Sequence, residues 1–194
     1  PNLPSLEDPS HHVTAADQRN WKCSAARAIE NSIDYSHFAW IHEGILGDRS
    51  RPESPGVDVV REGEEIKFEF SNPPDGLHGI AHTNYYRLGL PVSIIITKVE
   101  EDRKTKALNF VCTPVSADEC TRIFLITRNH PHDIEKDGGN EKFLDLVAEQ
   151  DRLIVENQQP QDLPLDLTEE LHVKGPDAGS LVYRRALREI GLDE

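Results

Sequence analysis

Alternation between apolar and polar positions marks a run of short strands through the middle of the chain. Between Ile66 and Phe70, apolar side chains alternate strictly with charged ones, which is the pattern of a strand with one buried face. Similar segments surround it, separated by turn-forming stretches such as PPDG and SADE. The predicted strands cover residues 57–60, 66–70, 81–88, 92–99, 106–114 and 121–128. Short spacing between the last four predicts an antiparallel meander.

Helical spacing of apolar residues appears on both sides of these strands. Residues 24–46 predict a helix before the strands, and residues 140–158 predict a long helix after them. A Pro-rich, acidic connection over 160–176 leads to a shorter predicted helix at 178–191. Residues 1–20 are rich in Pro, Ser, Asp and His and lack periodicity, so we expect a linker or entry segment there.

This order of elements predicts one α+β domain over residues 21–194. In such a domain a curved antiparallel sheet wraps around the long C-terminal helix and leaves a cavity between the two. The chain of 194 residues is long enough to bury a core of that kind.

The composition of the chain limits the kinds of partner that it can bind. The formal net charge of −14 repels phosphate backbones and anionic lipid surfaces, so we expect neither nucleic acid nor a membrane as partner. No apolar run reaches the length of a membrane span, and the first residues lack the pattern of a signal peptide. Cys23, Cys112 and Cys120 are odd in number and lack CxxC spacing, which favours reduced thiols in a cytoplasmic protein.

The first predicted helix contains two histidines, His37 and His42, and Asp34 precedes the first of them by three residues. Two imidazoles and one carboxylate on one octahedral face suit ferrous iron and leave positions open for dioxygen and substrate. Residues five apart on an ideal helix point about 140° away from each other. Both histidines therefore reach one metal only if the helix is irregular between residues 31 and 42. The residues alone also fit a core Asp–His pair with an unrelated second histidine.

Two separated motifs resemble those of Rieske-type non-haem iron oxygenases. The pattern Asn31-x-x-Asp34-x-x-His37-x-x-x-x-His42 is similar to the mononuclear-iron motif of their catalytic domains. Residues 149–159, EQDRLIVENQQ, look like the long helix of that family, which carries the third ligand. The two motifs occur in the family's order and resemble its vanillate demethylase-like branch, whose catalytic domain has a helix-grip fold of the START type.

The resemblance implies a role for each of these residues. His37, His42 and Asp151 would be the iron ligands, and Asn31 would lie beside the iron. Asp34 would bridge the iron site to a Rieske-cluster histidine of a neighbouring subunit. A carboxylate one turn from a ligand histidine can also accept its free N–H and fix its tautomer. The sequence leaves both roles open for Asp34.

The resemblance also implies an activity and its partners. The expected enzyme is a mono- or dioxygenase that uses Fe(II) and dioxygen to hydroxylate or O-demethylate a hydrophobic, aromatic substrate. The Cys-x-His and Cys-x-x-His pairs that hold a [2Fe–2S] cluster do not occur in residues 1–194. We therefore expect a Rieske domain upstream of this chain, a reductase or ferredoxin as electron donor, and a homotrimer of the full-length protein. Two alternatives are a non-enzymatic carrier of lipids or small molecules with the same fold, and a structural oxygenase subunit.

Other acidic and histidine side chains fit simpler explanations. His11 and His12 lie in the predicted entry segment, and His130 and His132 flank a proline in a predicted turn. Asp145 lies on the same helix as the third ligand but six residues earlier, about 600° around the helix, so it faces elsewhere.

We predict that replacing His37, His42 or Asp151 by Ala removes most of the bound iron, because each substitution deletes one ligand. The matched controls are His11→Ala and His132→Ala, which should retain the iron. Metal analysis of the purified variants provides the measurement. Full occupancy in a ligand variant, or loss in a control, would place the site elsewhere.

Overall fold

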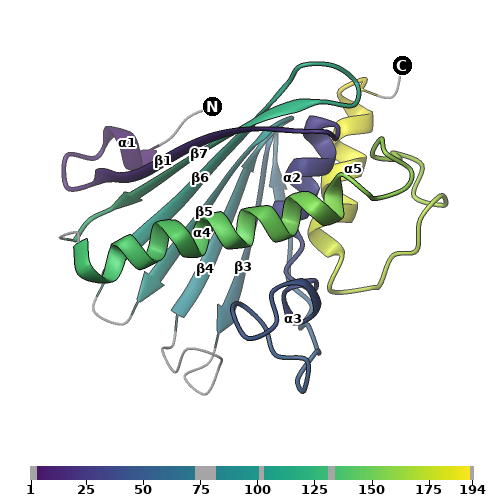
Figure 1. The fold of residues 1–194 in the computed structure, drawn as a ribbon. Helices are drawn as coiled ribbons and strands as arrows, with labels where there is room; N and C mark the ends of the chain where they lie inside the picture. The colour runs from purple at the N-terminus through teal and green to yellow at the C-terminus, as the bar shows by residue number, and fades with distance from the viewer. Residues whose placement is uncertain (1–3, 73–81, 101–102, 131–133, 193–194) are drawn as a thin grey trace.

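The computed structural model describes residues 4–72, 82–100, 103–130 and 134–192. One seven-stranded antiparallel sheet forms the body of the molecule, with strand order β1-β7-β6-β5-β4-β3-β2 (Figure 1). Its strands are β1 (His12–Trp21), β2 (Val60–Glu62), β3 (Glu65–Asn72), β4 (His82–Gly89), β5 (Ser93–Glu100), β6 (Thr105–Pro114) and β7 (Cys120–Arg128). The helices are α1 (Pro4–Glu7), α2 (Ala25–Ile33), α3 (Phe38–Ile41), α4 (Ile134–Val155) and α5 (Ala178–Glu189).

The long helix α4 runs across one face of the sheet, and α2 and α5 lie beside its C-terminal end (Figure 1). α2 contacts β5, β6 and β7 on one side and both α4 and α5 on the other. The predicted α+β fold, a curved antiparallel sheet around a long C-terminal helix, is confirmed. No helix within the described residues has the length and apolar character required to cross a membrane.

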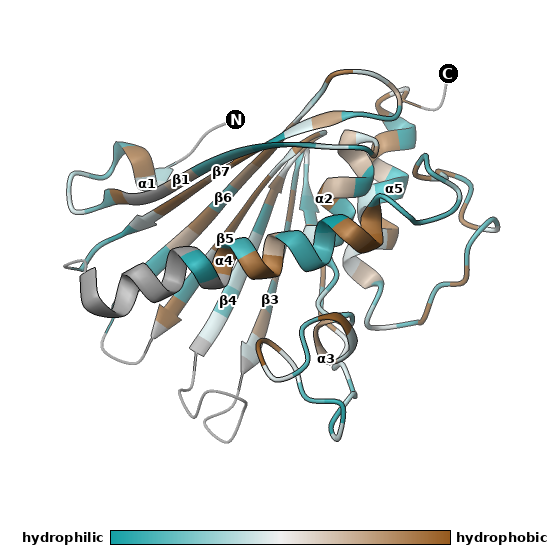
Figure 2. Ribbon diagram, viewed as in Figure 1, coloured by the Kyte–Doolittle hydropathy of each residue, from teal (hydrophilic) through white to brown (hydrophobic). Residues whose placement is uncertain are grey.

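The core lies where the sheet meets the helices. Figure 2 shows hydrophobic stretches along the strands behind α4, on α2 and at the C-terminal end of α4. Neighbouring strands stack aromatic rings there: Phe68 on Tyr86 with centroids 4.5 Å apart, and Phe110 on Phe124 at 4.7 Å. Cross-strand aromatic pairs of this kind stabilise one register of a sheet, because a shift by one residue moves every side chain to the other face.

Residues 12–21 form the edge strand β1, so the prediction of a linker was wrong for this segment. β1 pairs with β7 along its whole length, and the register shifts between Val13 and Ala15. Such a bulge breaks the two-residue period by which a strand is recognised. Polar side chains also join β1 to the helix layer. Arg19 forms ion pairs with Asp17 of the same strand and with Asp145 of α4. Asp145 thus faces away from the third predicted ligand, as expected.

A network of buried charges ties α2 to α5 and to the segment that follows α4. Glu30 accepts hydrogen bonds from Arg184, with oxygen–nitrogen distances of 2.5 and 2.8 Å. Arg27 pairs with Glu170 at 3.0 Å and donates to the backbone oxygen of Pro160 at 2.7 Å. Both guanidinium groups of this network therefore have a carboxylate partner, and α2 is anchored close to the point where the predicted metal-binding segment begins.

We predict that Glu30→Gln lowers the free energy of unfolding by about 3–5 kcal/mol, because it leaves Arg184 buried without its full countercharge. Urea denaturation measures the change. Glu189→Gln is the control: Glu189 pairs with Arg61 at the surface, where an ion pair contributes little. Equal, small effects in the two variants would show that the network does not stabilise the fold.

Candidate metal centre

The helix predicted over residues 24–46 is divided at the site. α2 ends at Ile33, and Asp34 has extended backbone angles of φ −72° and ψ 116°. The Asp34 carboxylate accepts a hydrogen bond from the backbone N–H of Ser36 at 2.7 Å, a local bond that replaces helical hydrogen bonding. The prediction of one continuous helix was therefore wrong beyond α2, and the prediction of an irregular segment before His42 is confirmed.

The two histidines lie at the two ends of the one-turn helix α3. His37 precedes the helix, and His42 follows it with φ −112° and ψ 37°, outside helical geometry. Their Nε2 atoms are 3.3 Å apart, and their ring planes are inclined by 68°. The rings converge although their residues are five apart, because neither lies inside a regular helix.

The loop after α3 packs directly onto that helix. The backbone N–H of Leu46 donates to the oxygen of His42 at 2.9 Å, and the N–H of Gly44 donates to the oxygen of Gly47 at 2.8 Å. A Cβ atom on Gly47 would lie 2.3 Å from the backbone nitrogen of Ala39. Only glycine permits this approach, and the contact keeps α3 and His42 in place.

α4 brings a carboxylate to the same point. Oδ1 of Asp151 lies 2.9 Å from Nε2 of His42 and 3.4 Å from Nε2 of His37. Ligands on one octahedral face, each about 2.1 Å from a metal ion, are about 3.0 Å from one another. Among the described residues, these three form the one group of His, Cys, Asp and Glu whose ligand atoms are close enough to hold a metal ion. The three side chains therefore fit a facial triad.

The opposite nitrogen of each ring faces a hydrogen-bond acceptor. Nδ1 of His37 lies 3.3 Å from Oδ2 of Asp34, and Nδ1 of His42 lies 2.9 Å from Oε1 of Gln150. A proton on Nδ1 leaves Nε2 free to bind a metal ion. Sequence reasoning did not single out Gln150, and the available signal was its position directly before Asp151 on the predicted helix.

The histidine and the carboxylates of the site favour each other's charged forms. Burial lowers the pKa of His37, but hydrogen bonds with Asp151 and Asp34 outweigh burial and raise it to about 9. Burial raises the pKa of Asp151, but hydrogen bonds from His37 and His42 hold it well below the ordinary range of a carboxylic acid. The hydrogen bond with His37 likewise keeps the pKa of Asp34 low in spite of burial. Uptake of a metal ion must then displace a proton from the triad.

The remaining candidates lie outside this constellation. Asn31 is half-buried in the last turn of α2, and no hydrogen bond described for the structure connects its side chain with the triad, so its role stays a prediction. Instead, the His11 ring bonds to the hydroxyl of Thr105 at the start of β6, and the His12 ring lies 3.2 Å from the backbone oxygen of His130. His132 lies outside the described residues.

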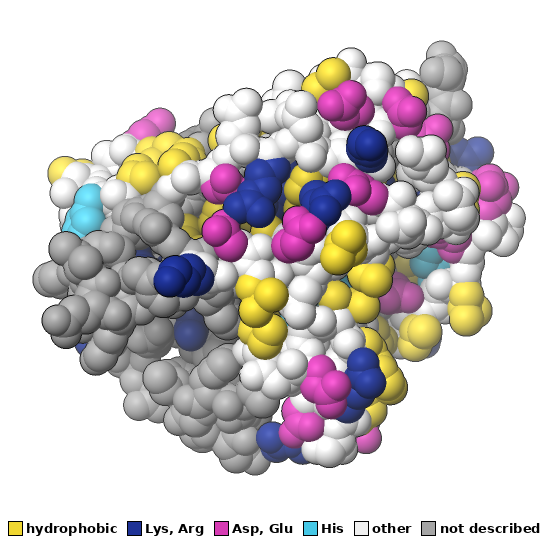
Figure 3. All heavy atoms as spheres, viewed as in Figure 1, with side chains coloured by type: hydrophobic (Ala, Val, Ile, Leu, Met, Phe, Trp, Pro, Cys, Tyr) yellow, Lys and Arg dark blue, Asp and Glu magenta, His cyan; other side chains and the backbone are white. Residues whose placement is uncertain are grey.

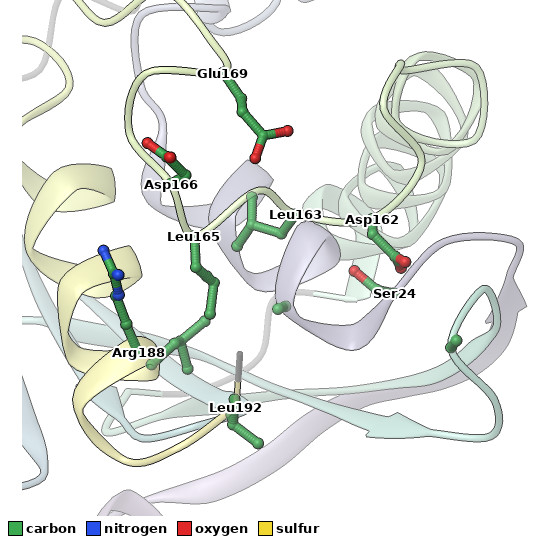
Figure 4. Close-up of a pocket in the computed structure, with 11 residues that line it drawn as sticks. Ser24, Asp162, Leu163, Leu165, Asp166, Glu169, Arg188 and Leu192 are labelled. Carbon is green, nitrogen blue, oxygen red and sulfur yellow. The ribbon is translucent and has the colours of Figure 1, made fainter. Parts of the chain in front are cut away.

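A pocket of about 660 Å³ lies away from the triad, between α2, α5 and the segment around Leu163 (Figure 4). Leucines form much of its wall, while Asp162, Asp166 and Glu169 lie at its rim. None of the three candidate ligands lines it. The substrate cavity predicted between the sheet and α4 is a different location and stays a prediction.

A helix-grip domain in which the segment around α3 and the long helix α4 bring two histidines and an aspartate together has the design of the catalytic domains of Rieske-type oxygenases. The sequence agrees with this class. Residues 21–192 match the family described as vanillate O-demethylase oxygenase C-terminal domain, and the chain belongs to that family.

Known relatives extend beyond this chain. It is 30% identical over 199 residues to methylxanthine N1-demethylase NdmA of Pseudomonas putida, covering 98% of this chain and 54% of the relative. It is 29% identical to methylxanthine N3-demethylase NdmB of the same organism, covering 99% and 54%. The solved structure of Pseudomonas putida CBB5 NdmA with caffeine has a TM-score of 0.84 and 28% identity, covering 98% and 55%. The chain thus spans about half the length of these relatives.

We predict that the metal-free protein loses stability as the pH rises from 6.5 to about 10. The pKa of His37 is about 9 in the folded protein, against an ordinary value of 6.5. The interactions that raise this pKa contribute their full stabilisation to the folded state below pH 6.5. This contribution to the free energy of unfolding is lost as the pH rises through 9. Urea midpoints with a chelator present, in wild type and His37→Gln, provide the measurement. The same decrease in both proteins would contradict the assignment.

Proposed function

We propose that this chain binds ferrous iron at His37, His42 and Asp151 and that the whole protein is a Rieske-type oxygenase. The observation that carries the proposal is the convergence of three ligand atoms, each within 3.4 Å of another, on a chain of an oxygenase-domain family. Ferrous iron in such a triad supplies the chemistry by which dioxygen oxidises a nearby carbon. The protein supplies the ligands, their orientation and the burial of the site.

The substrate that fits the proposal is hydrophobic and aromatic, and the reaction is hydroxylation or removal of a methyl group. The family carries the name of an O-demethylase, and the two relatives are named as N-demethylases of methylxanthines. In both cases the methyl group is attached to a heteroatom. We therefore favour demethylation at a heteroatom of an aromatic compound, with formaldehyde as the second product.

Two observations on Asp34 support both of the roles that the sequence leaves open. One carboxylate oxygen accepts from Nδ1 of His37, which orients that ligand. The side chain is nevertheless 33% exposed, whereas those of His37 and Asp151 are 14% and 11% exposed. This accessibility supports contact with the cluster-binding histidine of a neighbouring subunit. Electrons from a reductase or ferredoxin would then pass from a [2Fe–2S] cluster on the upstream Rieske domain to this iron.

Exposed apolar side chains on α3 and α4, the two helices next to the triad, support the proposed homotrimer. Trp40 of α3 is 53% exposed, and Leu153 and Ile154 of α4 are 51% and 48% exposed. Figure 3 shows several groups of hydrophobic side chains on the face of the molecule that is also viewed in Figure 1. Exposed apolar side chains that form a contiguous patch mark protein–protein contacts. In the proposed assembly, the Rieske domain of a neighbouring subunit covers them.

Metal analysis separates the oxygenase from the alternative carrier function. About one iron per chain, lost when His42 is replaced by Ala, supports the oxygenase. A purified protein without iron or affinity for iron, but with an apolar ligand bound, would overturn it. The isolated chain should bind iron yet show no turnover with dioxygen and a reductase, because residues 1–194 contain no ligand pairs for a cluster.

We predict that Asp34→Asn in the full-length protein retains iron and fold but stops electron transfer to the iron. The amide cannot act as the charged acceptor between two ligand histidines. Single-turnover oxidation of a pre-reduced cluster measures the transfer. Asp48→Asn is a matched control, since Asp48 makes the same local turn with Ser50 at 2.8 Å but lies away from the triad. If the cluster of Asp34→Asn is oxidised at the wild-type rate, Asp34 has only a structural role.

A further inference from the structure

Two consecutive residues of α4 hold both nitrogens of one imidazole ring. Oε1 of Gln150 lies 2.9 Å from Nδ1 of His42, and Oδ1 of Asp151 lies 2.9 Å from Nε2 of the same ring. Neighbouring residues on a helix point about 100° apart, so their side chains can reach opposite edges of a ring placed between them. His42 is 1% exposed, so its Nδ1 has no access to bulk water and depends on this acceptor.

We propose that Gln150 is a positioning residue for the metal centre; this inference rests on the proposed function. The amide oxygen holds the proton of His42 on Nδ1 and thereby reserves the lone pair of Nε2 for the metal. Without an acceptor at this position, the ring loses its preferred tautomer and its orientation. A buried N–H without a partner also carries a free-energy cost, which rotation of the ring away from the metal would relieve.

The two ligand histidines differ in the charge of their partners. His37 faces the carboxylate of Asp34, whereas His42 faces the neutral amide of Gln150. A ferrous ion together with the carboxylates of Asp34 and Asp151 has no net charge. A carboxylate at position 150 would give this set of charges a net negative charge and would favour ferric over ferrous iron. Gln150 therefore orients His42 without adding charge, which keeps the ferrous form favoured.

Two properties of the Gln150 side chain can be tested separately: its hydrogen-bond acceptor atom and its lack of charge. Gln150→Leu removes the acceptor and keeps the side chain neutral, while Gln150→Glu keeps an acceptor and adds charge. Glu149→Gln is the matched control, because Glu149 lies on the same turn but pairs with Arg152 towards solvent. All variants are made in the full-length protein.

The test measures the affinity for Fe(II) or Co(II) and the Fe(III)/Fe(II) ratio of the mononuclear site at one fixed potential. We expect Gln150→Leu to weaken metal binding about 10- to 100-fold and to change the visible spectrum of bound Co(II). We expect Gln150→Glu to retain the affinity but to raise the Fe(III)/Fe(II) ratio about tenfold. The control should match wild type in both measurements.

Wild-type affinity and Co(II) spectrum in Gln150→Leu would overturn the orienting role. An unchanged Fe(III)/Fe(II) ratio in Gln150→Glu would overturn the role of neutrality. Both outcomes differ from failure of the proposed function, in which the wild-type protein itself binds no metal at the triad. Circular dichroism of each variant shows whether the fold is retained, so a loss of affinity can be assigned to the site.

Discussion

The Asp151 carboxylate lies between two imidazole rings and joins segments that are 109 residues apart in the sequence. Polar side chains with so little exposure persist at such distances only if each has a partner of opposite character, because unpaired charges in a core are costly. The position of α4 on the sheet, the end of α2 and the direction of α3 must all agree for this contact to form. Errors of about 1 Å in any of them would separate the ligand atoms.

The surroundings of the triad are built to prevent such errors. The buried pairs of Arg27 and Arg184 with glutamates anchor α2 against α5, one turn before the chain leaves the helix at Asp34. Beyond α3, the close approach of Gly47 fixes the helix from its other side. These supports use different interactions, buried ion pairs and backbone packing, but both act on the short segment that carries the histidines. The proposed metal site would therefore be organised before the ion binds.

The acceptors of the two Nδ1 atoms both stabilise the site and orient the candidate ligands. Asp34 and Gln150 each accept from an Nδ1 atom, so one arrangement explains the burial of the rings and the direction of their Nε2 atoms. The same groups determine the electrostatic character of the centre, since one acceptor is charged and the other neutral. The partial exposure of Asp34 connects the buried triad with the surface, where the proposed neighbouring subunit would make contact.

Local patterns were enough to predict the strands β3 to β7 and the long helix, because alternation and helical spacing involve residues that are close in the sequence. The three candidate ligands came from the resemblance of two local motifs to those of the family. The same local patterns misassigned β1, whose bulge and polar side chains hide its pairing with β7. They also extended one helix through Asp34, where a side-chain bond to Ser36 replaces the helical one. The contacts of Gln150 with His42 and of Gly47 with α3 could not be predicted, because they depend on how the folded chain packs and no local pattern records that packing.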